Sequence, residues 1–324
     1  MKAIALFSGG LDSTLAIKLI VDQGIEVVAM NISTGFGATK DRYEHMQSMC
    51  DQVGAKLKIV DIQHEFLQDV LFSPKHGYGK NFNPCIDCHA KMFAVAKRMM
   101  DAEGASFLIS GEVLGQRPMS QNADALKTVL NEGNVEGLLL RPLSAKKLAP
   151  TVPEIEGWVD RERLEGIVGR NRDRQLALAK EFGLRDYESP GGGCLLTDEN
   201  FARKIRDFIK YDAFEVRDIP VLKHGRQLRI GERAKLVVGR NKEDNEHIKA
   251  IENDKFFHVR TVGIPGPHSL LSKSASEADK IEAARVILTY CKTSPDESYT
   301  IDIDGEQIEA SPFPSRDALQ KYFI

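Results

Sequence analysis

The sequence predicts a doubly wound α/β domain with a parallel sheet, followed by a smaller α+β domain. Three observations lead to this fold class: apolar runs alternate with helical periodicity over about residues 1–185, a glycine-rich turn follows the first run, and the charge balance changes near residue 200. Strands that alternate with helices imply right-handed crossovers and a parallel sheet covered on both faces. We therefore expect domains at 1–200 and 201–324.

The elements of the first domain follow one another in a regular order. Each expected strand is a short apolar run, and each expected helix carries apolar residues at helical spacing. The expected strands are 3–7, 25–32, 56–62, 106–110 and 137–143, and the expected helices are 12–24, 41–55 and 88–105. A sheet of this kind binds ligands beyond the C-terminal ends of its strands.

Composition sets broad limits on the class of protein. The chain has 324 residues, of which 42% are hydrophobic and 28% charged, as in ordinary soluble globular proteins. The opening "MKAIALF" is too short for a signal peptide, and no apolar run approaches the roughly 18 residues of a membrane helix. We expect a cytoplasmic protein. The net charge of -3 identifies no partner by itself.

The stretch "FSGGLDSTLAI" at 7–17 follows the first expected strand. Its glycines permit backbone angles that let several N–H groups converge, and Ser8 and Ser13 add hydroxyl donors. The helix that begins near Asp12 or Ser13 adds its positive dipole end. Together these groups predict an anion cradle of phosphate size. The alternative is an ordinary strand–turn–helix junction in which Asp12 is the N-cap.

The pattern of this turn separates it from two other nucleotide loops. It lacks the lysine of G-x-x-x-x-G-K-[ST] and the spacing of G-x-G-x-x-G. The motif S-G-G-x-D-S resembles the PP-loop of the ATP pyrophosphatase superfamily, whose fold is adenine nucleotide α-hydrolase-like. The resemblance implies that the loop binds ATP around the β- and γ-phosphates, that Asp12 lies near Mg²⁺, and that ATP is cleaved between its α- and β-phosphates. The residues so implied in ATP binding are Ser8, Gly9, Gly10, Asp12 and Ser13, with the adenine along Met30 and Ile32.

Five cysteines are present, two of them in a C-x-x-C formed by Cys85 and Cys88. Such a pair at a helix start can share a metal, form a disulfide or support one thiolate of lowered pKa. Cys194 is a third candidate because glycines precede it. Cys50 and Cys291 lie in amphipathic helical runs and are expected to be buried as small hydrophobes.

Two further segments carry a resemblance to tRNA thiouridine synthases of the PP-loop class. "NPCIDCHAKMF" at 83–93 resembles the N-P-C-x-x-C segment of the 2-thiouridylases, and "LISGEVLGQRPMSQN" at 108–122 resembles the G-E-x-L-G-Q segment of the 4-thiouridine synthases. The resemblance implies that Gly111, Glu112 and Gln116 contact the nucleotide or the uridine; a loop-capping role is the alternative for Glu112 and Gln116. Arg141 is expected either to contact a phosphate or to form a surface ion pair.

The implied activity is ATP-dependent thiolation of a tRNA uridine. The uridine carbonyl oxygen attacks the α-phosphate, pyrophosphate leaves, and a sulfur nucleophile then expels AMP. The sulfur, from a desulfurase or from sulfide, has two possible routes. Either Cys194 carries a persulfide that Cys85 resolves, or Cys85, Cys88 and Cys194 bind three irons of a [4Fe–4S] cluster whose fourth iron holds the sulfur. A purely structural role for the three thiols is a further alternative. The expected catalytic residues are Cys85, Cys194 and Asp12.

The charge of the chain changes sign along its second part. Between Arg203 and Lys242 there are twelve Lys/Arg and five Asp/Glu, whereas residues 243–324 hold nine and fifteen. A basic stripe of this kind is the electrostatic footprint expected for a phosphate backbone. The alternative is a solvated helix with counter-ions.

The motifs of this part favour RNA. The runs "AKLVVGRNKEDNEHIKAI" and "DKFFHVRTVGIPGPHSLL" resemble the RNA-binding C-terminal module of the NFACT family, in which a P-G-x-H turn precedes a helix. Arginine suits phosphate, and aromatic or histidine rings suit unstacked bases, although His258 and His268 could instead be packed in the core. The matching residues are Gly239, Arg240, Asn241, Phe257, His258, Pro265, Gly266 and His268. The expected partner is tRNA, and a homodimer is left open.

Two other functions compete with this interpretation. A PP-loop ligase or amidotransferase that acts on a small carboxylate would need neither three grouped thiols nor a basic extension. A non-catalytic RNA-binding factor with a degenerate nucleotide fold would not need the intact S-G-G-x-D-S.

Overall fold

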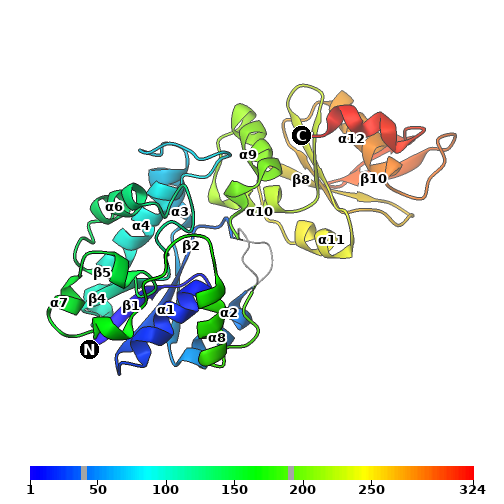
Figure 1. Cartoon of the computed structure of the whole chain (residues 1–324). Coiled ribbons are helices and arrows are strands. Elements are labelled where there is room, and N and C mark those ends of the chain that lie inside the picture. Colours follow the sequence, from blue (N-terminus) through cyan, green and yellow to red (C-terminus); the bar gives the residue numbers. More distant parts are fainter. Residues whose placement is uncertain (38–41, 189–192) are drawn as a thin grey trace. The chain divides into compact units, whose positions relative to one another are not determined.

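The computed structural model describes residues 1–37, 42–188 and 193–324. The chain divides into two compact units, Met1–Thr197 and Asp198–Ile324 (Figure 1). The division lies three residues before the boundary expected from the change in charge. Asp198 caps the first helix of the second unit, because its side chain accepts a hydrogen bond from the N–H of Phe201.

The first unit contains a five-stranded parallel sheet with the order β3-β2-β1-β4-β5. The predicted fold class is thereby confirmed, and the strands follow the predicted runs closely, except that the fifth is only two residues long. The strands are β1 (Lys2–Leu6), β2 (Glu26–Ser33), β3 (Lys56–Asp61), β4 (Phe107–Ser110) and β5 (Leu139–Leu140).

Helices cover both faces of this sheet (Figure 1). Ala3 and Ala5 point into one core, which they share with α1, α2 and α8. Because side chains alternate along a strand, Ile4 points to the opposite face, on which α4 packs against β1. The helices of this unit are α1 (Leu11–Val21), α2 (Tyr43–Val53), α3 (Gln63–Phe66), the π-turn η1 (Leu67–Leu71), α4 (Cys85–Arg98), α5 (Met100–Glu103), α6 (Ala123–Glu132), α7 (Val152–Ile155) and α8 (Asp173–Glu181), with short 3-10 turns η2 (Ala145–Lys147), η3 (Arg161–Arg163) and η4 (Leu195–Thr197).

The strand order reverses between β1 and β4: the connection from β1 leads to β2 on one side, and the connection from β4 leads to β5 on the other side. Loops that follow two such strands diverge and leave a crevice at the carboxyl edge of the sheet. The turn after β1 and the segment after β4, which holds Gly111 to Gln116, therefore flank the same position. This is the place at which the sequence predicts a bound nucleotide.

The second unit contains a six-stranded antiparallel sheet with the order β11-β10-β8-β9-β7-β6, against which α12 packs. The predicted α+β class is confirmed here too. One detail differs: the P-G-x-H turn leads into strand β9, and the helix comes only after it. The elements are α9 (Glu199–Tyr211), η5 (Val216–Asp218), α10 (Ile219–Lys223), β6 (Arg226–Ile230), β7 (Ala234–Val238), α11 (Lys242–Lys249), β8 (Phe256–Thr261), β9 (Ser269–Ser272), α12 (Glu277–Thr289), β10 (Tyr299–Ile303), β11 (Glu306–Ala310) and the 3-10 turn η6 (Arg316–Tyr322).

Across the described residues, the helices are all too short or too polar to traverse a lipid bilayer.

Candidate functional site

The glycine loop, Ser8–Ser13, runs from the end of β1 into the first turn of α1. Side chains of α2 fix the conformation of this loop at Gly9. Gly9 has a φ of 78°, which only glycine adopts without strain, and its carbonyl accepts a hydrogen bond from Nε2 of His45 at 3.1 Å. A Cβ at Gly9 would lie 2.9 Å from Cγ of Met46. Glycine is therefore required at this position by conformation and by space.

The start of α1 keeps its backbone donors available. Gly10 is the N-cap and makes no side-chain cap hydrogen bond, while its own N–H donates to Ser8 Oγ at 3.4 Å. Asp12 lies inside the helix, so the alternative in which Asp12 caps it is not the arrangement observed. Ser13 Oγ instead donates to the carbonyl of Gly10 at 2.9 Å, and Ser8 Oγ lies 3.3 Å from Ser13 Oγ. A helix start with free N–H groups is an anion site.

Gly111 brings the segment after β4 against this helix start. A Cβ at Gly111 would lie 2.5 Å from the backbone nitrogen of Ser13 and 2.6 Å from its Cα. Atoms do not approach so closely, so any side chain at this position would displace the glycine loop. The structure thus gives Gly111 a packing role beside the predicted nucleotide contact.

The carboxylate of Asp12 is fixed by two side chains from distant parts of the chain. Gln116 Nε2 donates to Oδ2 at 2.7 Å, and Arg172 Nη2 donates to Oδ1 at 3.0 Å. Gln175, which is fully buried, donates in turn to Gln116 Oε1 at 3.0 Å. The sequence predicted Asp12 and Gln116 as site residues, and it missed Arg172 and Gln175. The polar run "NRDRQ" at 171–175, which includes the start of α8, was the local signal for them.

Glu112 is buried and contacts two side chains, those of His89 and Arg141. Its Oε1 contacts His89 Nδ1 and its Oε2 accepts from Arg141 Nε, both at 2.9 Å. Burial by itself would raise the pKa of Glu112, but the charge of Arg141 and the hydrogen bond from His89 outweigh burial and lower this pKa to about 2. The carboxylate is therefore ionised and already paired. Arg141 forms an ion pair, but the pair is buried and does not lie at the surface as predicted, and Nη2 of Arg141 is buried without a hydrogen-bond partner among the described residues.

The residues predicted to line the adenine lie at the end of β2. Met30 is fully buried, and its carbonyl accepts a hydrogen bond from the N–H of Phe7 at 2.9 Å. Ile32 lies nearer the carboxyl end of the same strand and is also buried. An adenine contact through these two residues stays a prediction.

The three candidate thiols are brought together by two loops that pair. The N–H of Phe82 donates to the carbonyl of Leu196 at 3.2 Å, and Asn81 Nδ2 donates to the carbonyl of Thr197 at 2.6 Å. These contacts join the segment before Cys85 to the segment after Cys194. Helix α4 begins at Cys85, three residues earlier than predicted, so Cys85 and Cys88 occupy its first turn.

The surroundings of Cys88 and Cys194 oppose ionisation of these two thiols. Burial raises the pKa of Cys88, and the charges of Cys194 and Cys85 raise it further. Burial also raises the pKa of Cys194, which the backbone N–H groups of Leu196 and Thr197 and the charge of Arg117 partly oppose. Since thiolates are the reactive form, these sulfurs need a positive partner to react.

Three further facts describe the surroundings of the candidate thiols. Within the described ranges, no three His, Cys, Asp or Glu side chains are arranged to hold one metal ion. Asn83 Nδ2 donates to Cys85 Sγ at 3.2 Å, so one sulfur already has a polar neighbour. Gly191 and Gly192, two of the glycines that drew attention to Cys194, lie outside the described residues.

Burial as a small hydrophobe is confirmed for Cys50, whereas Cys291 is only partly buried. Cys50 is fully buried in the core of the first unit, where burial raises its pKa to about 12. Burial raises the pKa of Cys291 to about 11, and its thiol donates to the carbonyl of Ile287.

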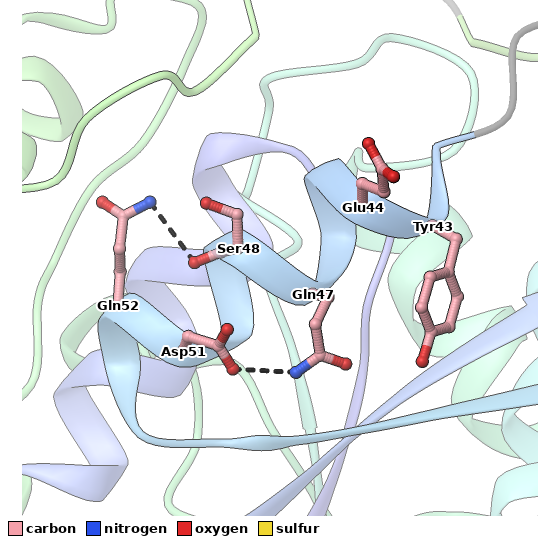
Figure 2. A pocket seen from close by; sticks show the side chains of 6 residues that line it. All are labelled: Tyr43, Glu44, Gln47, Ser48, Asp51 and Gln52. Carbon is pink, nitrogen blue, oxygen red and sulfur yellow. Dashed lines mark hydrogen bonds between the residues drawn. The ribbon is translucent and has the colours of Figure 1, made fainter.

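A hollow in the first unit lies away from this site. It has a volume of about 580 Å³ and follows the outer face of α2 (Figure 2). Its lining side chains are polar or form hydrogen bonds within the helix, as Gln47 does with Asp51. None of the predicted site residues lines it: the lining residues are Tyr43, Glu44, Gln47, Ser48, Asp51 and Gln52.

In the second unit, ion pairs occupy part of the basic stripe. Lys235 is fully buried and, together with Arg229, pairs with Asp207. Burial lowers the pKa of Lys235 to about 8. Arg217 and Arg240 also pair with carboxylates, whereas Lys242 is exposed. Only part of the stripe is therefore available to a phosphate backbone.

The NFACT-like motif residues hold one another in place. Asn241 caps α11 by accepting from the N–H of Asp244 at 2.9 Å, and Arg240 pairs with the same aspartate. Nδ1 of His258 lies 3.0 Å from Nε2 of His268, and Nε2 of His258 donates to the carbonyl of Ile251. Both histidines are only partly buried and contact each other, so neither is a core residue, and an RNA contact by them stays a prediction.

Both units match known families. Residues 1–148 match the family model "Thiamine biosynthesis protein (ThiI)", and residues 225–323 match "NFACT protein RNA binding domain". Two relatives are named "tRNA-specific 2-thiouridylase MnmA". The one from Pseudomonas fluorescens (strain SBW25) is 23% identical over 86% of this chain and 76% of its own length, and the one from Pseudoalteromonas translucida (strain TAC 125) is 22% identical over 87% and 78%.

Two solved structures are similar in part. One is titled "Crystal structure of a 4-thiouridine synthetase - RNA complex with bound ATP"; it is 19% identical, has a TM-score of 0.40, and the match covers 68% of this chain and 52% of that one. The other is the C-terminal part of the fibronectin/fibrinogen-binding protein of Streptococcus suis, 12% identical with a TM-score of 0.27 over 48% and 79% of the two chains.

Proposed function

We propose that this chain, a PP-loop protein joined to an NFACT-type RNA-binding domain, is an ATP-dependent tRNA thiouridine synthase. The predicted resemblance is confirmed by the two family models, and relatives with the 2-thiouridylase name extend over both units. The observation that carries the proposal is the grouping, within one unit, of a glycine loop at the crevice of the sheet with three electrostatically coupled thiols.

ATP binds with its phosphates in the glycine loop. The free N–H groups at the start of α1 and the dipole of this helix receive the negative charge. The loop is already ordered by its own hydrogen bonds, so little reorganisation is needed when pyrophosphate leaves. Attack by the uridine carbonyl oxygen forms the bond to the α-phosphate and breaks the bond to the β-phosphate.

The donor set around Asp12 is compatible with Mg²⁺. Each carboxylate oxygen accepts one hydrogen bond and retains a second lone pair, and oxygen donors are the ligands that Mg²⁺ prefers. Asp12 would hold the ion, which would neutralise charge on the departing pyrophosphate. Arg172 and Gln116 keep the carboxylate in one orientation.

The paired thiols suit a sulfur-transfer step that uses only groups of this chain and a donor. A persulfide on Cys194 attacks the activated ring carbon, and AMP leaves with the oxygen. Cys85 then attacks the Cys194 sulfur, so that a Cys85–Cys194 disulfide forms and the sulfur stays on the base. The disulfide is reduced before the next cycle by an external thiol. The charge of Cys85 raises the pKa of Cys194, which supports this route because such an effect requires the two sulfurs to be close.

A [4Fe–4S] cluster is the second route for the same three thiols. Cysteine thiolates are the usual ligands of such clusters, and each cysteine would bind a different iron, so this route does not require three of the described side chains to be arranged around one metal ion. Cys85, Cys88 and Cys194 would hold it, and its irons would stabilise thiolates that burial otherwise disfavours. Bound there, the cluster would supply an open iron for a sulfur donor.

Reconstitution tests the proposal. The purified full chain, MgATP and unmodified tRNA are supplied with either a cysteine desulfurase, cysteine and an external thiol, which serve the persulfide route, or sulfide, which serves the cluster route. One of the two mixtures should yield one thiouridine species by nucleoside mass spectrometry, with AMP and pyrophosphate formed in equal amounts. The tRNA of a strain deleted for the gene should lack the same nucleoside. AMP without thiouridine, or an unchanged nucleoside profile in the deletion strain, would overturn the proposal.

A further inference from the structure

Arg42 stands between the glycine loop and the segment of Cys194. This residue immediately precedes α2. Its Nη2 lies 3.7 Å from the position that a Cβ would take at Gly9, and its Nη1 lies 3.5 Å from the corresponding position at Gly193. Two glycines thus leave room for one guanidinium, with the nucleotide cradle on one side and the residue before Cys194 on the other.

The glycine loop contains no fully charged cationic group that could balance the charge of a bound phosphate. Backbone N–H groups and a helix dipole supply only partial charges, and the sequence Ser8–Ser13 has no lysine or arginine. Arg172 is committed to Asp12. Arg42 is the other guanidinium that the structure places against this loop, at Gly9.

The present partner of Arg42 is readily exchanged. Its Nη2 pairs with Glu188, whose side chain is about half exposed, and exposed ion pairs contribute little stability. Its Nε is buried with no hydrogen-bond partner among the described residues. A buried donor of this kind is rarely left unused in a native protein, and Nε together with Nη2 forms the fork that binds two oxygens of a phosphate.

We propose that Arg42 contacts the pyrophosphate part of bound ATP, exchanging Glu188 for phosphate oxygens. This inference rests on the proposed function and adds a residue that holds the leaving group. Glu188 serves as the counter-ion of Arg42 while the nucleotide is absent. The contact places a positive charge where negative charge grows during adenylation.

The test compares three probes, ATP, pyrophosphate and AMP, by calorimetry on the full chain. Arg42→Gln should weaken the binding of ATP and of pyrophosphate by about tenfold or more, since a charge-assisted contact is lost, and should change AMP binding by less than about twofold. Arg42→Lys should recover part of the loss. Glu188→Gln should bind ATP and pyrophosphate as tightly as the unmodified chain or more tightly, because the competing carboxylate is gone.

The exposed pair of Arg98 and Glu65 provides matched controls. Arg98→Gln and Glu65→Gln should leave all three affinities unchanged, and thermal unfolding of each variant checks that it is folded. Unchanged ATP and pyrophosphate binding in Arg42→Gln, an equal loss of AMP binding, or weaker binding in Glu188→Gln would overturn the role of Arg42. If any of these results is found while the unmodified chain still thiolates tRNA, the proposed function is retained and only the role of Arg42 is rejected.

Discussion

Gln116 Nε2 donates a hydrogen bond of 2.7 Å to Oδ2 of Asp12, a residue 104 positions earlier in the chain. The contact joins the segment after β4 to the glycine loop after β1. It leaves the Asp12 carboxylate with one oxygen held by an amide and the other by the guanidinium of Arg172. The orientation of the only carboxylate in the loop is thus set by residues outside it.

Gln116→Ala should impair adenylation through this contact. The loss of one hydrogen bond to a charged group corresponds to about a tenfold fall in kcat/KM for MgATP, measured as tRNA-dependent pyrophosphate release. Gln47→Ala, on the outer face of α2, is the control and should behave as the unmodified chain (Figure 2). Equal kinetics for Gln116→Ala would remove Gln116 from the site.

Gly111→Ala should abolish ATP binding with little loss of fold. The added methyl would collide with the backbone of Ser13, so the glycine loop must move. Gly104→Ala is a useful comparison, since Gly104 has a φ of 65° but no neighbouring atom of the described residues lies within 4 Å of the position that a Cβ would take there. That variant should lose about 1–2 kcal/mol of stability and keep its affinity for ATP. Normal ATP binding by Gly111→Ala would contradict the packing role.

Cys194→Ser should eliminate thiouridine while ATP binding persists. Cys291→Ser, in the second unit, is the control, because serine can keep the hydrogen bond to Ile287. Anaerobically purified protein distinguishes the two sulfur routes: a cluster gives a brown colour with absorbance near about 400 nm. An active, iron-free preparation would exclude the cluster, and unchanged thiolation by Cys194→Ser would exclude both routes.

Glu112 should make stability depend on pH in the acidic range. Its pKa in the folded chain, about 2, lies below the usual value of 4.5, so its contribution is complete above about 4.5 and is lost as the pH falls toward 2. Glu112→Gln should cost about 3–5 kcal/mol in urea unfolding at pH 7, because Arg141 is left buried without a counter-charge.

The surface pair of Glu132 with Lys75 serves as the reference for this experiment. Glu132→Gln should change the free energy of unfolding by less than about 1 kcal/mol. If Glu112→Gln unfolds at the same urea concentration as Glu132→Gln, the triad of Glu112, His89 and Arg141 is not the stabilising unit described here.

Affinity for tRNA should fall steeply as salt rises. Each phosphate contact contributes roughly one unit to the slope of log affinity against log salt, so Lys242→Ala, at an exposed position, should lower that slope by about one. Lys235→Met should leave it unchanged, because Lys235 is buried against Asp207. A slope near zero for the unmodified chain would refute the electrostatic interpretation of the stripe.

Patterns of neighbouring residues were sufficient to predict most strands and helices of the first unit and part of the candidate site. Apolar periodicity predicted the five parallel strands, and S-G-G-x-D-S predicted the loop, because both depend on neighbours in the chain. The start of α4 was misplaced by three residues: helical periodicity begins to show at Cys88, whereas the helix itself starts directly after Pro84. The motif histidines could not be assigned from the sequence, since whether they pair or face solvent depends on how β8 meets the turn before β9.

The sequence by itself predicted a glycine turn suited to phosphate and determined a C-x-x-C pair and a basic extension, because each of these is a pattern of neighbouring residues whose chemistry is fixed. Only the tertiary structure decided which groups serve that turn. Arg172 reaches Asp12 across 160 positions, and Arg42 meets Gly9 and Gly193 from a different loop. Such contacts are formed when the helices pack on the sheet, and a side chain carries no local mark of the distant partner to which packing will bring it.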